Sequence, residues 1–199
     1  GFCHENGYAI GTYNYARCCL KGIGGPADFL TGKKLLEEAA NKGLAIALRL
    51  IGESYLYGLN GYPEYYYEAR NWYHKAALQL DPYSMYNLGC LYFEGKGGKQ
   101  DLAEAAKWFE KAAYYDNVSA MVNYGIACRY GKGVPQDCYK AFRYFGECEK
   151  DKELFNSYVL GGVEILHKKL VEEAKTPSDF INKLYDFVQE FNERFNDEI

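Results

Sequence analysis

The sequence predicts an all-α protein, a right-handed α-solenoid of antiparallel helix pairs that closes with a C-terminal capping helix. Three observations lead to this prediction: a pattern that recurs about every 36 residues, a glycine-rich turn within each copy, and an unusual balance of glycine and proline. Glycine contributes 21 of the 199 residues and proline only 5. This balance is typical of glycines within and between helices rather than of proline-rich linkers.

The second helix of each repeat is recognised by an aromatic or apolar pair that small residues follow. The two clearest copies are Asn71–Ala77 and Lys107–Ala113, whose tryptophans lie 36 residues apart. The pair recurs as Tyr144–Phe145, a further 36 residues on, and as Leu35–Leu36, 37 residues before the first tryptophan. Because these small and bulky residues recur at helical spacing, the pattern predicts one buried face on a helix.

A glycine-rich turn precedes each of these helices and ends the helix before it. A Gly-x-Gly segment provides backbone positions with positive φ at little steric cost, so the first helix of each repeat should end there. Asp28, Asp101 and Asp137 follow where an N-cap belongs, and their carboxylates can accept from the free amides of the second helix. The second turn carries one extra residue, which explains the single 37-residue spacing and puts Tyr65 in the cap position.

The first helix of the second, third and fourth repeats carries a glycine in its interior. These glycines are Gly52, Gly89 and Gly125. A glycine inside a helix costs about 1 kcal/mol relative to alanine. Their recurrence therefore indicates close packing between the two helices of a repeat. Such a hairpin cannot bury its apolar faces alone, whereas stacked copies can, and stacking produces an α-solenoid.

These motifs together resemble the Sel-one-like repeat, a relative of the tetratricopeptide repeat. The first copy departs from the family pattern by having Leu35–Leu36 in place of the aromatic pair, and the last departs from it at Gly146–Glu149. The predicted boundaries place repeats at 11–46, 47–83, 84–119 and 120–155.

The two ends of the chain carry further predictions. Residues 1–10 align with the end of a second helix, so we expect the tail of a preceding truncated repeat and a chain taken from a longer array, the alternative being a frayed natural N-terminus. Residues 156–175 are expected to form a degenerate fifth repeat helix, and 176–199 the capping helix. The helix over 176–199 either closes the solenoid core or docks onto another domain or protomer, and the sequence leaves both open.

Composition and motifs argue against several functional classes. The net charge is −4 without a basic stripe, which disfavours nucleic acid as the main partner. No apolar run approaches the roughly 20 residues that a membrane span needs. The sequence contains no C-x-x-C pair, no cluster of histidines and no S-x-x-K motif, so we expect no metal, no cofactor and no catalytic residue.

The cysteines carry a prediction about location. We interpret these cysteines mainly as small, buried hydrophobic residues. The family resemblance implies one disulfide per repeat in some bacterial members, but the corresponding positions here hold Ala113 and Met121. A reducing, cytoplasmic location is therefore expected.

The family resemblance also implies where a partner would bind. In tetratricopeptide arrays the first helix of each repeat lines the concave surface. The residue before the Leu-Gly position should face this groove, and residues three and seven further on share its face. The predicted partner-binding residues are Asn14, Arg17, Lys21, Leu50, Glu53, Tyr57, Asn87, Cys90, Glu94, Asn123, Ile126 and Tyr130.

The chemistry of these residues suits a peptide or protein partner. Three are asparagines at one equivalent position, and an amide can both donate to and accept from a peptide backbone. The alternative is that these amides bond only within their own repeats. The predicted groove is basic in the first repeat and acidic in the middle, and tyrosine is an efficient contact residue. The cluster Tyr65–Tyr67 is either a ligand patch or packing under the longer second turn.

The expected function is that of a protein-interaction scaffold or adaptor, which binds a peptide or protein on the concave face and performs no chemistry. One alternative is a regulatory or substrate-recruiting module of a larger enzyme or signalling protein whose active part precedes residue 1. Another is a site for a small ligand or glycan in a groove lined by tyrosines.

Overall fold

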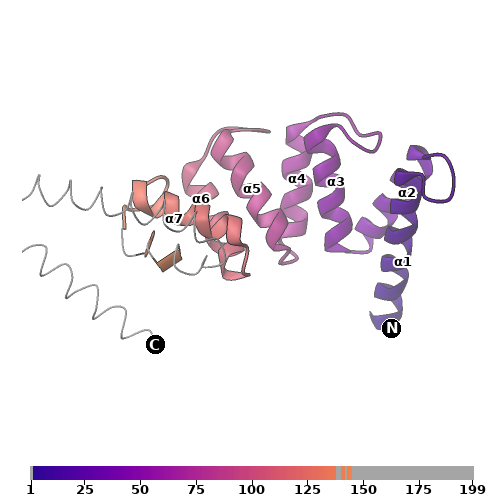
Figure 1. The fold of residues 1–199 in the computed structure, drawn as a ribbon, viewed down its shortest axis with the longest axis horizontal. Coiled ribbons are helices and arrows are strands. Elements are labelled where there is room, and N and C mark those ends of the chain that lie inside the picture. The colour runs from indigo at the N-terminus through magenta and orange to yellow at the C-terminus, as the bar shows by residue number, and fades with distance from the viewer. Residues whose placement is uncertain (1, 138–139, 142, 145–199) are drawn as a thin grey trace, which may run out of the picture. The chain divides into compact units, whose positions relative to one another are not determined.

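The computed structural model describes residues 2–137, 140–141 and 143–144, with side chains from Tyr8 onward (Figure 1). The chain divides into two compact units, Gly1–Ala120 and Met121–Ile199. The predicted helices at 156–175 and 176–199 lie outside the described residues. Within these residues there are helices and no strands, which confirms the all-α class. The helices are α1 (Phe2–Lys21), α2 (Phe29–Asn41), α3 (Ala45–Tyr57), α4 (Tyr66–Ala77), α5 (Pro82–Glu94), α6 (Leu102–Tyr114) and α7 (Val118–Tyr130).

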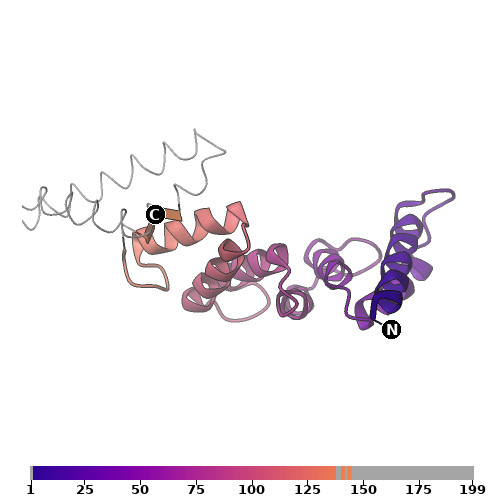
Figure 2. The ribbon, with the colours of Figure 1, turned by 90° about the horizontal axis from the view of Figure 1, so that it is seen from below.

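The first unit is built from three helical hairpins. Helix α1 packs on α2, α3 on α4, and α5 on α6. The hairpins follow one another in chain order, since α2 also contacts α3 and α4 contacts α5 (Figure 1 and Figure 2). This is the arrangement of a helical-repeat solenoid, in which each repeat buries its apolar faces against its neighbours.

One backbone hydrogen bond closes the turn within every repeat. The amide at the cap position of the second helix donates to a carbonyl in the last turns of the first helix. The four pairs are Asp28 to Cys19 at 2.9 Å, Tyr65 to Tyr55 at 2.8 Å, Asp101 to Tyr92 at 3.0 Å and Asp137 to Cys128 at 2.9 Å. The donors and acceptors sit at equivalent repeat positions, and the second pair spans one residue more than the others. The alignment and the single insertion are therefore confirmed.

The predicted helix ends and caps are also confirmed. Gly58 and Gly95 end α3 and α5 with φ of 63° and 71°. Asp28 accepts from the amide of Thr31 at 3.0 Å, and Asp101 accepts from that of Glu104 at 2.9 Å. A hydrogen bond of this kind satisfies a helix amide that would otherwise have no partner.

The interior glycines lie where two helices approach closely. A Cβ on Gly52 would stand 3.0 Å from the ring of Tyr73, and one on Gly89 would stand 2.6 Å from the ring of Phe109. Both rings are buried and come from the second helix of the same repeat. The predicted close packing is confirmed at these two positions.

The start of the chain forms one helix. Helix α1 runs without a turn from Phe2 to Lys21, so residues 2–10 continue directly into the first helix of the first repeat. The assignment of residues 1–10 to the tail of a preceding repeat stays a prediction. The hydroxyl of Thr12 donates to the carbonyl of Tyr8 at 2.9 Å, so this polar side chain bonds within the helix. The repeat boundaries themselves stay predictions.

The longer second turn is held down by Tyr62. This side chain is only 3% exposed and its ring packs edge-on against that of Tyr55, with centroids 4.9 Å apart. Its hydroxyl donates to Glu37 at 3.3 Å, and the ammonium of Lys33 lies 4.2 Å from its ring centre. Burial and the nearby Glu37 carboxylate raise the pKa of the Tyr62 phenol. The turn of the second repeat is thus anchored on α2 of the first.

Candidate functional site

All of the predicted partner-binding residues lie at least partly on the surface. The exposed ones are Asn14, Arg17, Lys21, Tyr57, Glu94 and Tyr130. The half-buried ones are Leu50, Glu53, Asn87, Cys90, Asn123 and Ile126. Nine of them belong to α1, α3 and α5 of the first unit, while Asn123, Ile126 and Tyr130 belong to the second unit. Only the nine residues of the first unit can therefore be related to one another in the structure.

A groove of about 350 Å³ lies between α1 and α3. It is lined by Tyr13, Arg17, Leu20, Lys21, Ile46, Leu50 and Asn60. Three of the predicted residues, Arg17, Lys21 and Leu50, meet in it. This groove is the part of the predicted surface with the clearest geometry, because two neighbouring first helices and a turn define its walls.

Asn60 was missed by the sequence reasoning. It lies in the longer second turn with φ of 56°, a left-handed conformation that asparagine adopts more readily than most residues. Its Nδ2 donates to Oγ of the buried Ser54 at 2.8 Å, and this hydroxyl donates to the carbonyl of Leu50 at 2.7 Å. The sequence did contain a signal for Asn60, namely the extra residue beside the Asn60–Gly61 pair. An insertion in a regular repeat indicates that the turn differs in structure from the other turns.

The groove is basic because its cations form no ion pair with the residues that the structure describes. Arg17 lies 5.6 Å over the ring of Tyr13, and it forms no ion pair with any described residue. Lys21, one turn further along α1, likewise lacks an ion pair in the described part of the chain. Both side chains are exposed, and none of the described residues that line the groove is acidic.

The predicted acidic residues are in a different situation. Glu94 pairs with the ammonium of Lys96 at 2.7 Å, and Glu53 pairs with Arg49 at 3.5 Å. Burial raises the pKa of Glu53, although the Arg49 charge opposes this effect. These carboxylates already have partners of opposite charge, so they are less available to a ligand than Arg17 and Lys21.

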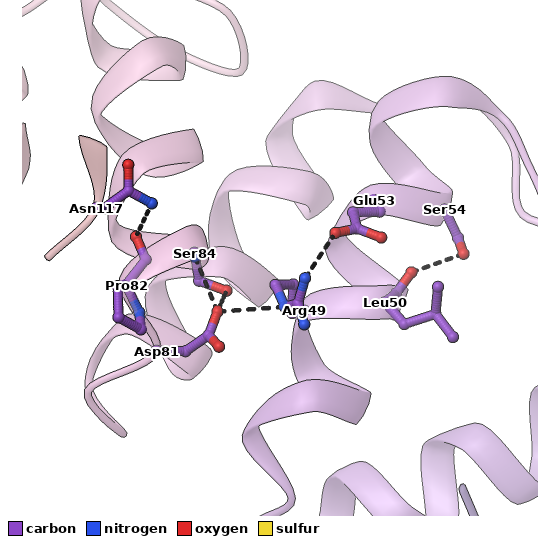
Figure 3. Close-up of polar contacts among 8 residues, drawn as sticks. All are labelled: Arg49, Leu50, Glu53, Ser54, Asp81, Pro82, Ser84 and Asn117. Carbon is purple, nitrogen blue, oxygen red and sulfur yellow. Dashed lines mark hydrogen bonds and ion pairs between the residues drawn. The ribbon is translucent and has the colours of Figure 1, made fainter. Parts of the chain in front are cut away.

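Glu53 also belongs to a polar network that joins two repeats (Figure 3). Arg49 bridges Glu53 to Asp81, whose Oδ2 lies 3.4 Å from the arginine Nε. Asp81 caps α5 by accepting from the amide of Ser84 at 2.9 Å and from its hydroxyl at 2.6 Å. A cap on the third repeat is thereby tied to the first helix of the second, which gives Glu53 a structural role that sequence spacing did not reveal.

A second polar link is made one repeat further on. Nδ2 of Asn117 donates to the carbonyl of Pro82 at 3.5 Å, and its Oδ1 caps α7 by accepting from the amide of Ala120 at 2.9 Å. Figure 3 shows this contact beside the Arg49 network. Residues that cap the first helices thus also connect neighbouring repeats.

The predicted asparagines are not used inside the fold that is described. The side chains of Asn14, Asn87 and Asn123 form no hydrogen bond with any described residue. The alternative of bonding within the repeats gains no support from the described contacts, and a role of these amides in recognition stays a prediction. Cys90, on the same face as Asn87, has a thiol whose pKa is raised by burial, against a smaller opposing effect of Tyr86.

The tyrosine cluster after the second turn is largely solvent-exposed. Tyr65 is 52% exposed and Tyr67 is 53% exposed, with ring centres 6.0 Å apart. The hydroxyl of Tyr66 donates to Glu64. The residue that packs beneath this turn is Tyr62, so the interpretation of Tyr65–Tyr67 as packing under the turn is wrong. The buried tyrosine comes three residues earlier in the turn, where the Tyr62 side chain packs against α2.

The described residues offer neither a metal site nor a membrane-spanning helix. These residues contain no group of three or more histidine, cysteine, aspartate or glutamate side chains placed to hold a metal ion. None of the helices among them combines the length and the apolar character required to span a bilayer.

Comparison with known proteins agrees with the repeat seen in sequence and structure. The Sel1 repeat pattern matches residues 9–44, 45–79, 82–114 and 118–147. The last three matched segments start at the first residues of α3, α5 and α7. No protein with a curated description matches the chain.

Two solved structures are similar to this chain. One is a protective antigen present in uropathogenic Escherichia coli strains that displays an SLR fold, with 31% identity and a TM-score of 0.68 over 71% of this chain and 30% of that one. The other is a Sel1 repeat protein from Oxalobacter formigenes, with 29% identity and a TM-score of 0.68 over 73% of this chain and 60% of that one. This chain thus spans less than two thirds of the length of either.

The four matched repeats cover more than half of the chain and agree with the helices of the structure. Sel1 repeats are generally non-catalytic scaffolds that bind other proteins. The chain belongs to the Sel1 repeat family of helical-repeat solenoids.

Proposed function

We propose that this chain is a protein-interaction scaffold that binds a peptide or protein on the exposed face of its first helices. The observation that carries the proposal is the groove between α1 and α3, where predicted residues from two neighbouring repeats meet. The general role of Sel1 repeats in binding proteins supports the same function. Helix packing fixes the walls of the groove, so a partner meets a preformed surface. Binding therefore costs less free energy for ordering the protein.

The rest of the proposed surface continues over α5. Asn87 supplies an amide without an intramolecular hydrogen bond among the described residues, and the exposed Tyr57 of α3 supplies an aromatic contact. Amides fit the hydrogen-bonding groups of a peptide backbone, and tyrosine offers a large rigid contact area. We further propose a cytoplasmic location, in line with the free thiols of Cys18, Cys19, Cys90 and Cys128.

The test is a quantitative pull-down with the wild-type chain and an Asn14/Asn87/Asn123→Ala variant as baits. A Lys34→Ala/Lys107→Ala variant is the matched control, because both lysines are exposed on second helices. We expect a small set of proteins to be retained by the wild type and the control and lost from the asparagine variant. Thermal melts of all three baits check that the fold is intact.

Two results would contradict the proposal in different ways. Equal capture by all three baits would place the binding surface away from the asparagines. The absence of any reproducible partner in a lysate that contains the natural partners would argue against a scaffold function altogether.

A further inference from the structure

We infer that the groove between α1 and α3 binds an acidic peptide segment, with its carboxylates at Arg17 and Lys21 and an aliphatic side chain on Leu50. This inference rests on the proposed function and specifies the chemistry of the partner. It follows from three properties of the groove: the sign of its charge, its apolar floor and the amide at its edge.

The sign of the charge comes from α1. Arg17 and Lys21 lie four residues apart on one helical face, so both reach the same side of the groove. Neither forms an ion pair within the described residues, and no carboxylate lines the groove. A concave site lined by one sign of charge concentrates ligands of the opposite sign, and a guanidinium matches a carboxylate in a two-bond geometry.

The floor and the edge of the groove favour a peptide over a small anion. Ile46 and Leu50 are half-buried, so each leaves some apolar surface for an aliphatic side chain to cover. At the edge, Asn60 uses Nδ2 to bond Ser54, and its Oδ1 has no hydrogen bond among the described residues. This oxygen can accept from a peptide N–H.

The equivalent positions of later repeats do not reproduce this chemistry. Arg17 and Lys21 correspond to Glu53 and Tyr57 in the second repeat and to Cys90 and Glu94 in the third. These positions carry no cation, so the acidic part of the ligand is confined to the end of the surface formed by α1. The remainder of the peptide then lies toward α3.

The probe is a fluorescein-labelled peptide of repeating Asp-Leu-Glu units, titrated with the purified full chain and followed by fluorescence anisotropy. Three matched peptides serve as controls. In the first, lysine replaces both acidic residues; in the second, asparagine and glutamine replace them. In the third, serine replaces leucine. We expect the acidic peptide with leucine to bind most tightly. Its binding should weaken as salt is raised, because the cations are exposed.

Variants of the chain locate the binding. An Arg17→Glu/Lys21→Glu variant is expected to bind the acidic peptide with an affinity lower by about tenfold or more, since two attractive charges become repulsive. Lys34→Glu/Lys107→Glu changes the net charge equally at exposed sites on other helices and should leave binding within about twofold of the wild type. Leu50→Ala should lower the affinity for the acidic peptide several-fold. The affinity for the peptide with serine should hardly change.

The outcomes separate this inference from the proposed function. Equal loss in both charge variants, tighter binding of the lysine peptide, or no binding of any peptide would each overturn the acidic-peptide inference. Competition by millimolar inorganic phosphate without any effect of Leu50→Ala would also overturn it, because the groove would then be a simple anion site. The scaffold function is judged independently, by the pull-down with the asparagine variant.

Discussion

The hairpins α3–α4 and α5–α6 share one backbone pattern and begin their second helices in different ways. Helix α6 starts at a cap, where the carboxylate of Asp101 accepts from a helix amide. Helix α4 begins after the N-cap residue Tyr65, whose side chain makes no capping hydrogen bond. The turn before α4 is instead anchored by the buried ring of Tyr62 on α2. A helix start can thus be specified by local hydrogen bonding or by tertiary burial.

The same difference affects the candidate site. The turn between α5 and α6 has the common length and contributes no residue to the groove. The turn between α3 and α4 is one residue longer and contributes Asn60 to the groove. The contacts of Tyr62 anchor this longer turn, and the turn supplies the polar side chain of Asn60 to the groove between α1 and α3.

The largest expected effect comes from the tryptophans of the two hairpins. Trp108 on α6 is 4% exposed, whereas Trp72 on α4 is only half-buried. Trp108→Ala should lower the free energy of unfolding by about 3–5 kcal/mol, because a large cavity remains in a buried layer. Trp72→Ala should cost clearly less. Urea unfolding followed by circular dichroism measures both, and an unchanged midpoint for Trp108→Ala would contradict the packing of α6.

The glycine positions provide the second test. At Gly89 an added methyl group would meet the ring of Phe109 at 2.6 Å, so the ring must move; at Gly52 the ring of Tyr73 stands at 3.0 Å. We expect Gly89→Ala to cost about 1–2 kcal/mol, since overpacking outweighs the gain in helix propensity. Gly52→Ala should be closer to neutral. If the two variants melt at the same temperature, the closer approach in the third repeat has no energetic meaning.

The two helix starts themselves provide the third test. Asp101→Ala removes a capping hydrogen bond and should cost about 1 kcal/mol. Tyr65→Asp adds a capping acceptor to an exposed position and should raise stability by about 0.5–1 kcal/mol. Chemical denaturation of both variants against the wild type measures the effects. A destabilised Tyr65→Asp would show that the tyrosine contributes to α4 in a way other than capping.

The smallest effect at neutral pH is expected at Tyr73, the residue of α4 that corresponds to Phe109 of α6. Its hydroxyl is buried and has no hydrogen bond among the described residues. Tyr73→Phe should therefore be neutral or stabilise by up to about 1 kcal/mol, because an unsatisfied polar group is removed.

The same variant has a distinct pH dependence. Burial, with a further contribution from the Glu53 charge, raises the pKa of Tyr73 far above its ordinary value of 10.0. The unfolded chain therefore loses this proton first, and the stability that the neutral phenol provides is present below pH 10 and lost as the pH rises above it. Tyr73→Phe should lose less stability than the wild type above pH 10. Parallel curves in denaturation from pH 8 to 11 would contradict the burial of this hydroxyl.

Site features that depend on spacing within one helix could be predicted from the sequence, whereas those that depend on contacts between repeats could not. Helical spacing alone predicts that Arg17 and Lys21 share one side of their helix, and both line the groove together with Leu50. Glu53 was placed on the same face, but its pairing with Arg49 and through it with Asp81 joins residues up to 32 positions apart. Asn60 and Tyr62 were not predicted, since their roles depend on where one repeat meets the next.

The sequence by itself determined the repeat, the helix ends and the caps. These features depend on φ preferences at Gly58 and Gly95 and on hydrogen bonds that span three residues, as at Asp101, so they are local. Only the tertiary structure decided that α1 and α3 enclose a groove, that its cations form no ion pair with described residues and that the inserted turn reaches it. Those properties arise when separate repeats pack together, because the distance between two helices depends on every side chain buried between them.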